Sequence, residues 1–435
     1  MFNQFEISFN MWATQLSTMK MSIAEVLFFL LASTTIVPAQ AEQYILFCVG
    51  NHPSKNVWEE IHQDFNTSQD ARVRVGVAGI FSYLDEPAAE VENELRRFLQ
   101  LAQQNGLPVV VQLDGENWWR ARPDLWNWWD PSQPGYSPGN CTNVEWSGWS
   151  SSNAVKIAWR DWGDKIRVLP PPNLMSPAYR SACHEEMRTL VPIVVNWWQA
   201  LPPDRKDLFV GLKVGWESSI GVNAWYYPNG NELVNQPSSN DFTNRLNMDL
   251  LPARGVAAIG YAAVETAGIR SAGELREADL AEVIRLHLTD LCRVAAGLGI
   301  PREKLFTHTG GWKENELLFE SGLNSYSCPG WSFYRYAANP KRDVGVQNAL
   351  KKTDAPFYAA AEWLYQGPRE TVPWENAIAG TLANPRCKYM CVFNWRDICN
   401  SPEIIQGVRE EVGQLNQGAP ATAISGLPNP QEKQP

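Results

Sequence analysis

Between about residue 44 and residue 415, short runs of apolar residues alternate with stretches whose apolar residues recur every three or four positions. Continuous apolar runs are typical of strands buried on both faces of a parallel sheet, and the second pattern is typical of amphipathic helices. The clearest helix patterns cover 90–104 and 277–297. The runs predict eight strands, at 44–49, 73–80, 108–113, 208–215, 304–309, 322–328, 357–363 and 388–395.

Eight strands that alternate with helices predict an α/β fold, a (β/α)8 TIM barrel over 42–416 with long Trp-rich βα loops. The loop at 114–180 holds nine of the twenty tryptophans, and a second long loop follows at 223–239. A doubly wound open sheet is the alternative architecture. It is disfavoured because no glycine-rich phosphate loop follows the first strand.

The two ends of the chain differ from this pattern. Lys20 precedes an apolar run at 26–37, and Ala39-Gln40-Ala41 offers a small-x-small cleavage site. The run is too short to span a bilayer, so we expect 1–41 to be a cleaved secretory signal, with an uncleaved anchor as the alternative. The polar, proline-rich 417–435 predicts a disordered tail. These features predict a secreted, extracytoplasmic protein with no stable membrane span after cleavage.

Charge and cysteine content narrow the class of protein. A net charge of −10 argues against a nucleic-acid partner, which needs a basic surface. Eight cysteines permit disulfide bonds in an exported chain, and Cys141 and Cys183, which flank one loop, are the best candidates for a bridge. Histidines and cysteines do not follow the spacing of a known metal site, and we expect no metal and no cofactor.

Two predicted strands end on a glutamate beside a tryptophan, at Glu217 and Glu362. A carboxyl group is costly to bury, so its place at the end of an apolar strand indicates a raised pKa and chemistry. Two such groups at the same end of a barrel are what a glycosidase needs as acid and nucleophile.

The pattern of strand ends resembles the clan A (β/α)8 glycoside hydrolases, which are retaining enzymes with catalytic glutamates on strands four and seven. The resemblance implies that Glu217 is the acid/base and Glu362 the nucleophile. It also implies a tyrosine near strand six that hydrogen-bonds Glu362, here Tyr326, and a sugar platform at strand eight, here Trp395. Trp216 stands where the clan has an asparagine that contacts the sugar 2-hydroxyl.

The expected function is hydrolysis of O-glycosidic bonds, of a β-linked neutral hexoside in an oligosaccharide or polysaccharide substrate. Two alternatives remain open: an inverting barrel hydrolase, and a catalytically inactive carbohydrate-binding barrel. His308 is also explained as a structural histidine, and Trp395 as core packing. The predicted substrate-binding residues are Asp114, Glu116, Asn117, Trp118, Trp216, Tyr226, His308, Tyr326, Trp363 and Trp395.

Overall fold

The computed structural model describes residues 42–50, 53–65, 67–161, 165–220, 224–237, 256–310 and 317–418. The predicted signal at 1–41 and all but the first two residues of the predicted tail lie outside these ranges. Among the described residues, no helix combines the length and the apolar character needed to cross a bilayer.

The core of the fold is a closed barrel of eight parallel strands in the order β1-β12-β11-β10-β9-β6-β3-β2. Neighbouring strands pair in parallel throughout, which confirms the predicted (β/α)8 TIM barrel. The strands are Gln43–Cys48 (β1), Val73–Ser82 (β2), Val109–Asp114 (β3), Phe209–Ser218 (β6), Leu305–Thr309 (β9), Gly330–Phe333 (β10), Tyr358–Trp363 (β11) and Cys387–Val392 (β12).

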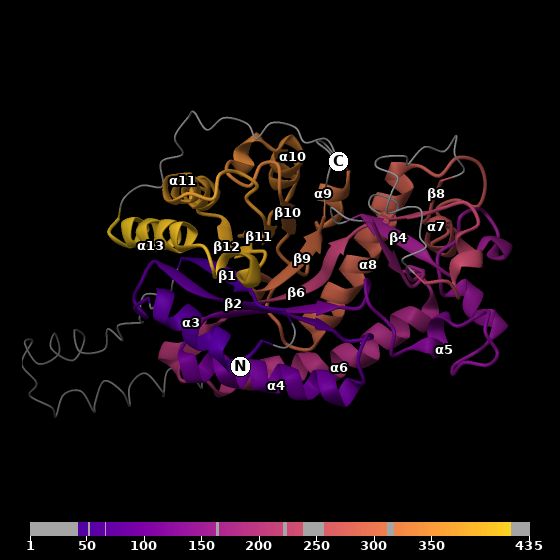
Figure 1. The fold of residues 1–435 in the computed structure, drawn as a ribbon, viewed down its shortest axis with the longest axis horizontal. Coiled ribbons are helices and arrows are strands. Elements are labelled where there is room, and N and C mark those ends of the chain that lie inside the picture. The colour runs from indigo at the N-terminus through magenta and orange to yellow at the C-terminus, as the bar shows by residue number, and fades with distance from the viewer. Residues whose placement is uncertain are drawn as a thin grey trace, which may run out of the picture. The chain divides into compact units, whose positions relative to one another are not determined.

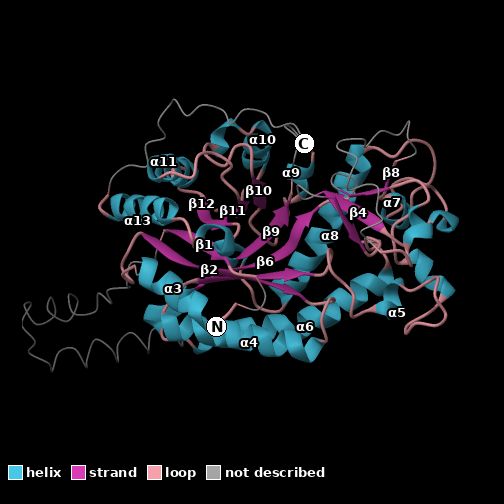
Figure 2. Cartoon of the chain, in the orientation of Figure 1, coloured by secondary structure: helices cyan, strands magenta, loops and turns pink. Residues whose placement is uncertain are grey.

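Helices surround the barrel and cover its outer face (Figures 1 and 2). Figure 1 shows α3, α4 and α6 on one side of the strands and α10, α11 and α13 on the other. The covering helices are Lys55–Phe65 (α3), Ala88–Asn105 (α4), Pro177–Ala200 (α6), Glu277–Gly297 (α8), Leu318–Ser321 (α9), Val344–Lys352 (α10), Thr371–Leu382 (α11) and Pro402–Asn416 (α13).

Alternate residues of a strand serve two different cores. In β1, Tyr44 and Leu46 belong to the cluster inside the barrel, whereas Ile45 and Phe47 belong to the cluster between strands and helices. All four side chains are buried, which explains why the strand is apolar throughout and does not alternate with polar residues.

The two long loops fold together beside the barrel. Their strands form a four-stranded antiparallel sheet in the order β5-β4-β7-β8. The second loop continues beyond the predicted 223–239 as far as α8, and the backbone N–H of its Ala262 donates a 3.2 Å hydrogen bond to Glu145 of the first loop. The remaining elements are Pro123–Trp126 (α5), Ala158–Asp161 (β4), Lys165–Val168 (β5), Ala224–Tyr226 (β7), Ala257–Ala258 (β8), Tyr261–Thr266 (α7) and Trp395–Ile398 (α12).

The sequence prediction of strand six at 322–328 is wrong. The strand is β10, Gly330–Phe333, and only Cys328 of the predicted segment forms an isolated bridge, with Phe306 near the start of β9. The segment is polar and turns back on itself, since Asn324 Oδ1 accepts the N–H groups of Tyr326 and Ser327. It therefore leads into the barrel strand at its amino end.

The predicted bridge between Cys141 and Cys183 is not formed, and all eight cysteines are free thiols. Cys183 is fully buried and hydrogen-bonds Tyr83 and Tyr179, while Cys141 is half-buried within the first long loop. The fold is therefore held by its apolar cores without covalent links among the described residues.

Candidate active site

Glu217 lies in a β-bulge at the carboxyl end of β6, the fourth barrel strand. Val214 pairs with Thr307 of β9 but Ser218 pairs with Thr309, so β6 carries two extra residues here. Gly215 and Glu217 have φ angles of 79° and 48°. A Cβ on Gly215 would collide with the Ser218 hydroxyl, so this position requires glycine. The bulge turns the Glu217 side chain into the mouth of the barrel.

Glu362 also lies at a register shift, on β11, the seventh barrel strand. Trp331 of β10 pairs with Ala360, whereas the next residue, Ser332, pairs with Glu362. Ala359 and Ala361 belong to the inner cluster. Regular alternation would place Glu362 outside the barrel, and the bulge brings it inside instead.

Tyr334 joins the two carboxyl groups. Its hydroxyl is hydrogen-bonded to Oε1 of Glu217 and lies 2.7 Å from Oε1 of Glu362. A tyrosine hydroxyl has one proton, so both contacts are hydrogen bonds only when one carboxyl group carries a proton of its own. The geometry therefore fits a pair that shares one proton.

Further polar groups surround each carboxyl group. Ser332 Oγ donates a 2.9 Å hydrogen bond to Oε1 of Glu217, and Trp216 Nε1 donates one of 3.0 Å to Oε2 of Glu362. Two buried cations, Arg160 of β4 and Lys213 of β6, act on this pair by their charge. The site thus combines elements of the barrel with one from the small sheet.

The electrostatic environment raises both acidic pKa values. Burial and, to a smaller extent, the adjacent Glu217 raise the pKa of Glu362 to about 8, against the opposing effects of Tyr334, Lys213 and Trp216. Burial likewise raises the pKa of Glu217 against the hydrogen bonds from Tyr334 and Ser332. One of two such neighbours remains protonated near neutral pH.

The acidic residues after strand three are held by bonds within the protein. Oδ1 of Asp114 accepts the N–H groups of Glu116 and Asn117 at 2.9 and 3.3 Å, and burial raises the pKa of Asp114 to about 7. Glu116 accepts a 2.6 Å bond from Ser218, the residue after Glu217. Nδ2 of Asn117 donates to the carbonyl of Trp216. These three predicted substrate contacts are thus hydrogen-bonded to one another and to the residues on either side of Glu217.

His308 is completely buried beneath Glu217. Its Nδ1 accepts from the Glu217 N–H, and Nε2 lies 2.9 Å from Ser332 Oγ. Both ring nitrogens are therefore engaged within the protein. The structure explains His308 as a structural histidine of the site, which was the alternative to the predicted substrate contact.

Two predicted aromatic contacts, Tyr326 and Trp363, lie away from the carboxyl pair, and the third, Trp395, is largely packed into the core. Tyr326 precedes β10 and so lies at the opposite end of that strand from Tyr334. Trp363 faces the outer core, where its Nε1 donates to the Ala337 carbonyl at 2.8 Å. Trp395 is 3% exposed because it packs on Phe47 and Phe65.

Trp118 and Tyr226 belong to the small sheet. Both are half-buried and pack against its apolar cluster, which includes Ala158 and Ala224. The Tyr226 hydroxyl accepts the N–H of Asn231 at 3.2 Å. These contacts place both half-buried rings against the core of the joined loops.

A cavity of about 490 Å³ opens at the carboxyl ends of β1 and β12 and adjoins the site through Trp216. Trp216 and Phe393 line it with ring centroids 6.4 Å apart, and Trp395 contributes to its border. Its polar lining includes Glu60 and Arg396. A mostly apolar cavity of this size with a few polar groups is typical of small-molecule sites.

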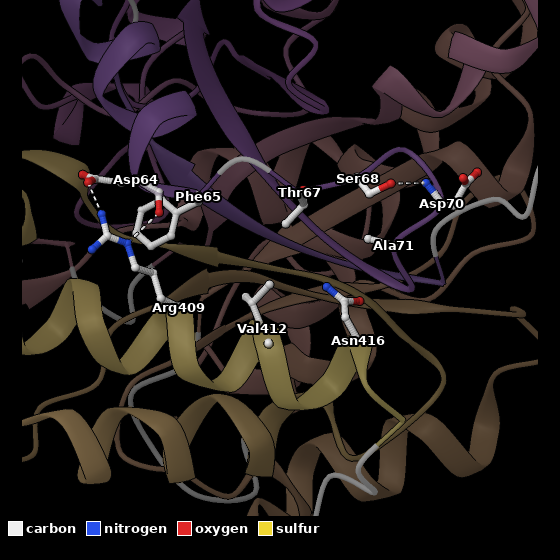
Figure 3. Close-up of a pocket in the computed structure, with 10 residues that line it drawn as sticks. Asp64, Phe65, Thr67, Ser68, Asp70, Ala71, Arg409, Val412 and Asn416 are labelled. Carbon is white, nitrogen blue, oxygen red and sulfur yellow. Dashed lines mark hydrogen bonds and ion pairs between the residues drawn. The ribbon is translucent and has the colours of Figure 1, made fainter.

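A second cavity, of about 460 Å³, lies at the other end of the barrel (Figure 3). Asp64 and Arg409 form an ion pair at its edge. Asn416 holds Val73, the first residue of β2, through bonds to both its N–H and its carbonyl. This cavity is remote from the carboxyl pair, because the amino end of β2 and the carboxyl end of β11 are opposite ends of the barrel.

Four residues of the site were not predicted: Lys213, Ser332, Tyr334 and Arg160. Lys213 had a usable signal, since a lysine within an apolar strand is rarely buried without a specific role. Ser332 and Tyr334 were not predicted because strand six was placed at 322–328, before these two residues. The sequence around Arg160 did not indicate a site residue, because Arg160 lies within the predicted loop at 114–180 and not at the end of a predicted barrel strand. Within the described ranges, His, Cys, Asp and Glu side chains do not gather in threes as a metal site would require.

No family model and no curated protein matches the chain. Similar solved structures include a GH5 subfamily 18 enzyme from Bifidobacterium longum in complex with Manb1-4GlcNAc, with a TM-score of 0.43, 10% identity and coverage of 87% of this chain and 80% of that chain. The YdhT protein from Bacillus subtilis has a TM-score of 0.41 and 8% identity, covering 86% and 85%. A GH5-4 broad specificity endoglucanase from an uncultured bacterium has a TM-score of 0.41 and 6% identity, covering 88% and 96%. These values describe a shared course of the chain and assign neither a family nor a substrate.

Proposed function

We propose that the protein is a retaining glycoside hydrolase in which Glu217 is the acid/base and Glu362 the nucleophile. The observation that carries the proposal is the Tyr334 hydroxyl, which is hydrogen-bonded to one oxygen of each carboxyl group. Two raised pKa values at the mouth of a barrel support the same assignment.

The separation of the carboxyl groups favours retention over inversion. An O–H···O hydrogen bond is at most about 3 Å long, so two oxygens that share one hydroxyl are within about 6 Å of each other. Retaining enzymes hold their carboxyl groups about 5–5.5 Å apart, whereas inverting enzymes need about 6.5–9.5 Å to admit a water molecule. The shared tyrosine fits the first class.

The proposed reaction has two steps. Glu362, ionised, attacks the anomeric carbon while protonated Glu217 gives its proton to the departing glycosidic oxygen. Glu217, now ionised, takes a proton from water, which attacks the anomeric carbon and releases the sugar from Glu362. Tyr334 and Trp216 stabilise the negative charge on Glu362 before the attack and after its release.

The cavity beside Trp216 is the proposed site for the sugar that is released. Trp216 and Phe393 offer apolar ring surfaces, and the two charged residues at its lining have opposite signs. An excess of positive charge, which an acidic sugar would favour, is not found among these lining residues. The proposed substrate is therefore a neutral hexoside, β-linked to an oligosaccharide or polysaccharide.

Anomer-resolved proton NMR of the first product, from a panel of neutral aryl and oligosaccharide β-glycosides, tests the proposal. We expect the β-anomer to form first. Initial release of the α-anomer would establish inversion. Binding of oligosaccharides without any cleavage would favour the inactive carbohydrate-binding barrel.

A further inference from the structure

We infer that Lys213, His308 and Ser332 form a hydrogen-bond chain of one fixed direction that ends on Oε1 of Glu217 and stabilises the ionised form of this carboxyl group. The inference rests on the proposed function for its catalytic meaning. The three residues are positioning residues, because each acts through Glu217 and not on the substrate.

The direction of the chain is set at Nδ1 of His308, which is approached by Lys213 and by the Glu217 backbone N–H. Nζ of Lys213 lies 3.2 Å from Nδ1 of His308 and 3.1 Å from the Ala361 carbonyl, deep inside the barrel. A lysine ammonium group only donates hydrogen bonds. The Glu217 backbone N–H, also a donor, addresses the same ring nitrogen at 3.3 Å. Nδ1 is therefore an acceptor and bears no proton.

An unprotonated Nδ1 fixes the histidine tautomer. Burial, reinforced by the charge of Lys213, lowers the pKa of His308 well below its usual value, so the ring is neutral. Its single proton is then on Nε2, which lies 2.9 Å from Ser332 Oγ and donates to it. The Ser332 hydroxyl proton must turn elsewhere, toward Oε1 of Glu217 at 2.9 Å.

The end of the chain distinguishes the two oxygens of Glu217. Oε1 accepts from Ser332 and contacts Tyr334, and a Cβ at Gly310 would approach Glu217 Cβ to 2.8 Å. Glycine at 310 therefore leaves room for this orientation of the carboxyl group. The donor that the chain holds against Oε1 therefore stabilises the ionised carboxylate of Glu217.

Other charged and titratable groups also face Glu217, from five different elements. They are Arg160 on β4, Lys213 on β6, His308 on β9, Tyr334 after β10 and Glu362 on β11. Ser332, by contrast, carries no charge and belongs to the chain, so it can be changed without altering any of these groups. It is therefore the residue through which the chain is best tested.

The first experiment measures the tautomer of His308 directly. Ring-¹⁵N labelling of the five histidines gives one set of signals per residue, and the set that changes most in Ser332→Ala is assigned to His308. We expect a neutral ring with its proton on Nε2 across neutral pH. A proton on Nδ1, or a charged ring at pH 7, would overturn the chain, whether or not the protein is an enzyme.

The second experiment measures the titration of Glu217 by ¹³C NMR of its carboxyl carbon, assigned with Glu217→Gln. Ser332→Ala removes a donor to the ionised carboxylate, so the pKa of Glu217 is expected to rise by about one unit. Ser332→Thr keeps a hydroxyl and is expected to restore the original value. An unchanged titration in Ser332→Ala would contradict the inference.

The same change is expected in catalysis. In Ser332→Ala the alkaline limb of kcat/KM moves to higher pH by about one unit, with kcat lowered and KM little changed. Ser321→Ala is the matched control, because Ser321 is a buried serine that donates to Ala281 in another part of the fold. If cleavage depends on Glu217 and Glu362 but the alkaline limb does not move in Ser332→Ala, the hydrogen-bond chain is refuted and the proposed function is not. Absence of cleavage would refute the proposed function and leave the NMR results to decide the chain.

Discussion

The indole N–H of Trp216 donates a 3.0 Å hydrogen bond to Oε2 of Glu362. Through this bond the tryptophan before Glu217 directs an N–H group to the other carboxyl group of the site. The indole ring serves a second purpose, since it forms a wall of the adjoining cavity. One residue thus joins the proposed nucleophile to the proposed sugar site.

Trp216→Phe is expected to lower kcat/KM by about 10- to 100-fold. The phenyl ring keeps most of the cavity wall, but the carboxylate of Glu362 loses a donor worth about 1.5–3 kcal/mol. Steady-state kinetics on the best substrate of the panel measures the loss. Trp197→Phe is the control, because Trp197 loses a similar bond, to Gln103, far from the barrel mouth. Equal effects of the two variants would argue against the role of Trp216.

Tyr334→Phe tests whether Tyr334, found in the structure, or Tyr326, predicted from the sequence, is the tyrosine of the site. Loss of the hydroxyl removes the hydrogen-bonding group that links the two carboxyl groups, and kcat is expected to fall by about 100-fold. Tyr326→Phe is expected to retain full activity, since Tyr326 lies at the other end of β10. Activity lost in Tyr326→Phe and kept in Tyr334→Phe would contradict the position of strand six.

The pH profile of kcat/KM is expected to be a bell displaced toward neutral and alkaline pH. Below the lower pKa of the pair both carboxyl groups are protonated and no nucleophile exists. Above the upper pKa both are ionised and no acid exists. Because burial raises the pKa of both carboxyl groups, the alkaline limb, which reports the proposed acid Glu217, is expected at higher pH than for a solvated glutamate. A limb near pH 5, as for solvated glutamates, would contradict the burial of the pair.

Glu145→Gln is expected to reduce the loss of stability at alkaline pH. Burial raises the pKa of Glu145 to about 8, so the folded chain holds this proton more tightly than the unfolded chain. Stability from this group is complete below about pH 4 and is lost as pH rises through about 8. Thermal unfolding from about pH 5 to about pH 9 should show a smaller decrease in Tm for Glu145→Gln. Parallel curves for both proteins would exclude a titrating Glu145.

The sequence predicted the fold because burial on both faces makes the strands continuous apolar runs. β1, with one core inside and another outside the barrel, shows this directly. Strand six escaped prediction because β10 has only four residues and follows Pro329, so its pattern is too short to read. Because strand six was misplaced, Tyr334 was not recognised as the tyrosine at the end of this strand.

The site was harder to predict than the fold because the direction of both glutamate side chains depends on β-bulges. Ala359 and Ala361 point into the barrel, so regular alternation would place Glu362 outside it and Trp363 inside it. On that pattern Trp363 is a reasonable candidate for a sugar contact. The register shift on β11 instead turns Glu362 into the barrel and Trp363 out of it, and the local sequence does not predict this shift. Arg160 shows a second limit, since it reaches the carboxyl groups through the fold of a long loop.

The most direct test of the central claim is kcat/KM of Glu217→Gln and Glu362→Gln on the cleaved glycoside. Each variant keeps the shape of the side chain and removes its acid–base chemistry, and each is expected to lose at least about 100-fold. Glu411→Gln is the control, since Glu411 is also buried but lies on α13, outside the barrel mouth. We predict that only the first two variants lose activity. Wild-type kcat/KM in either of them would contradict the account.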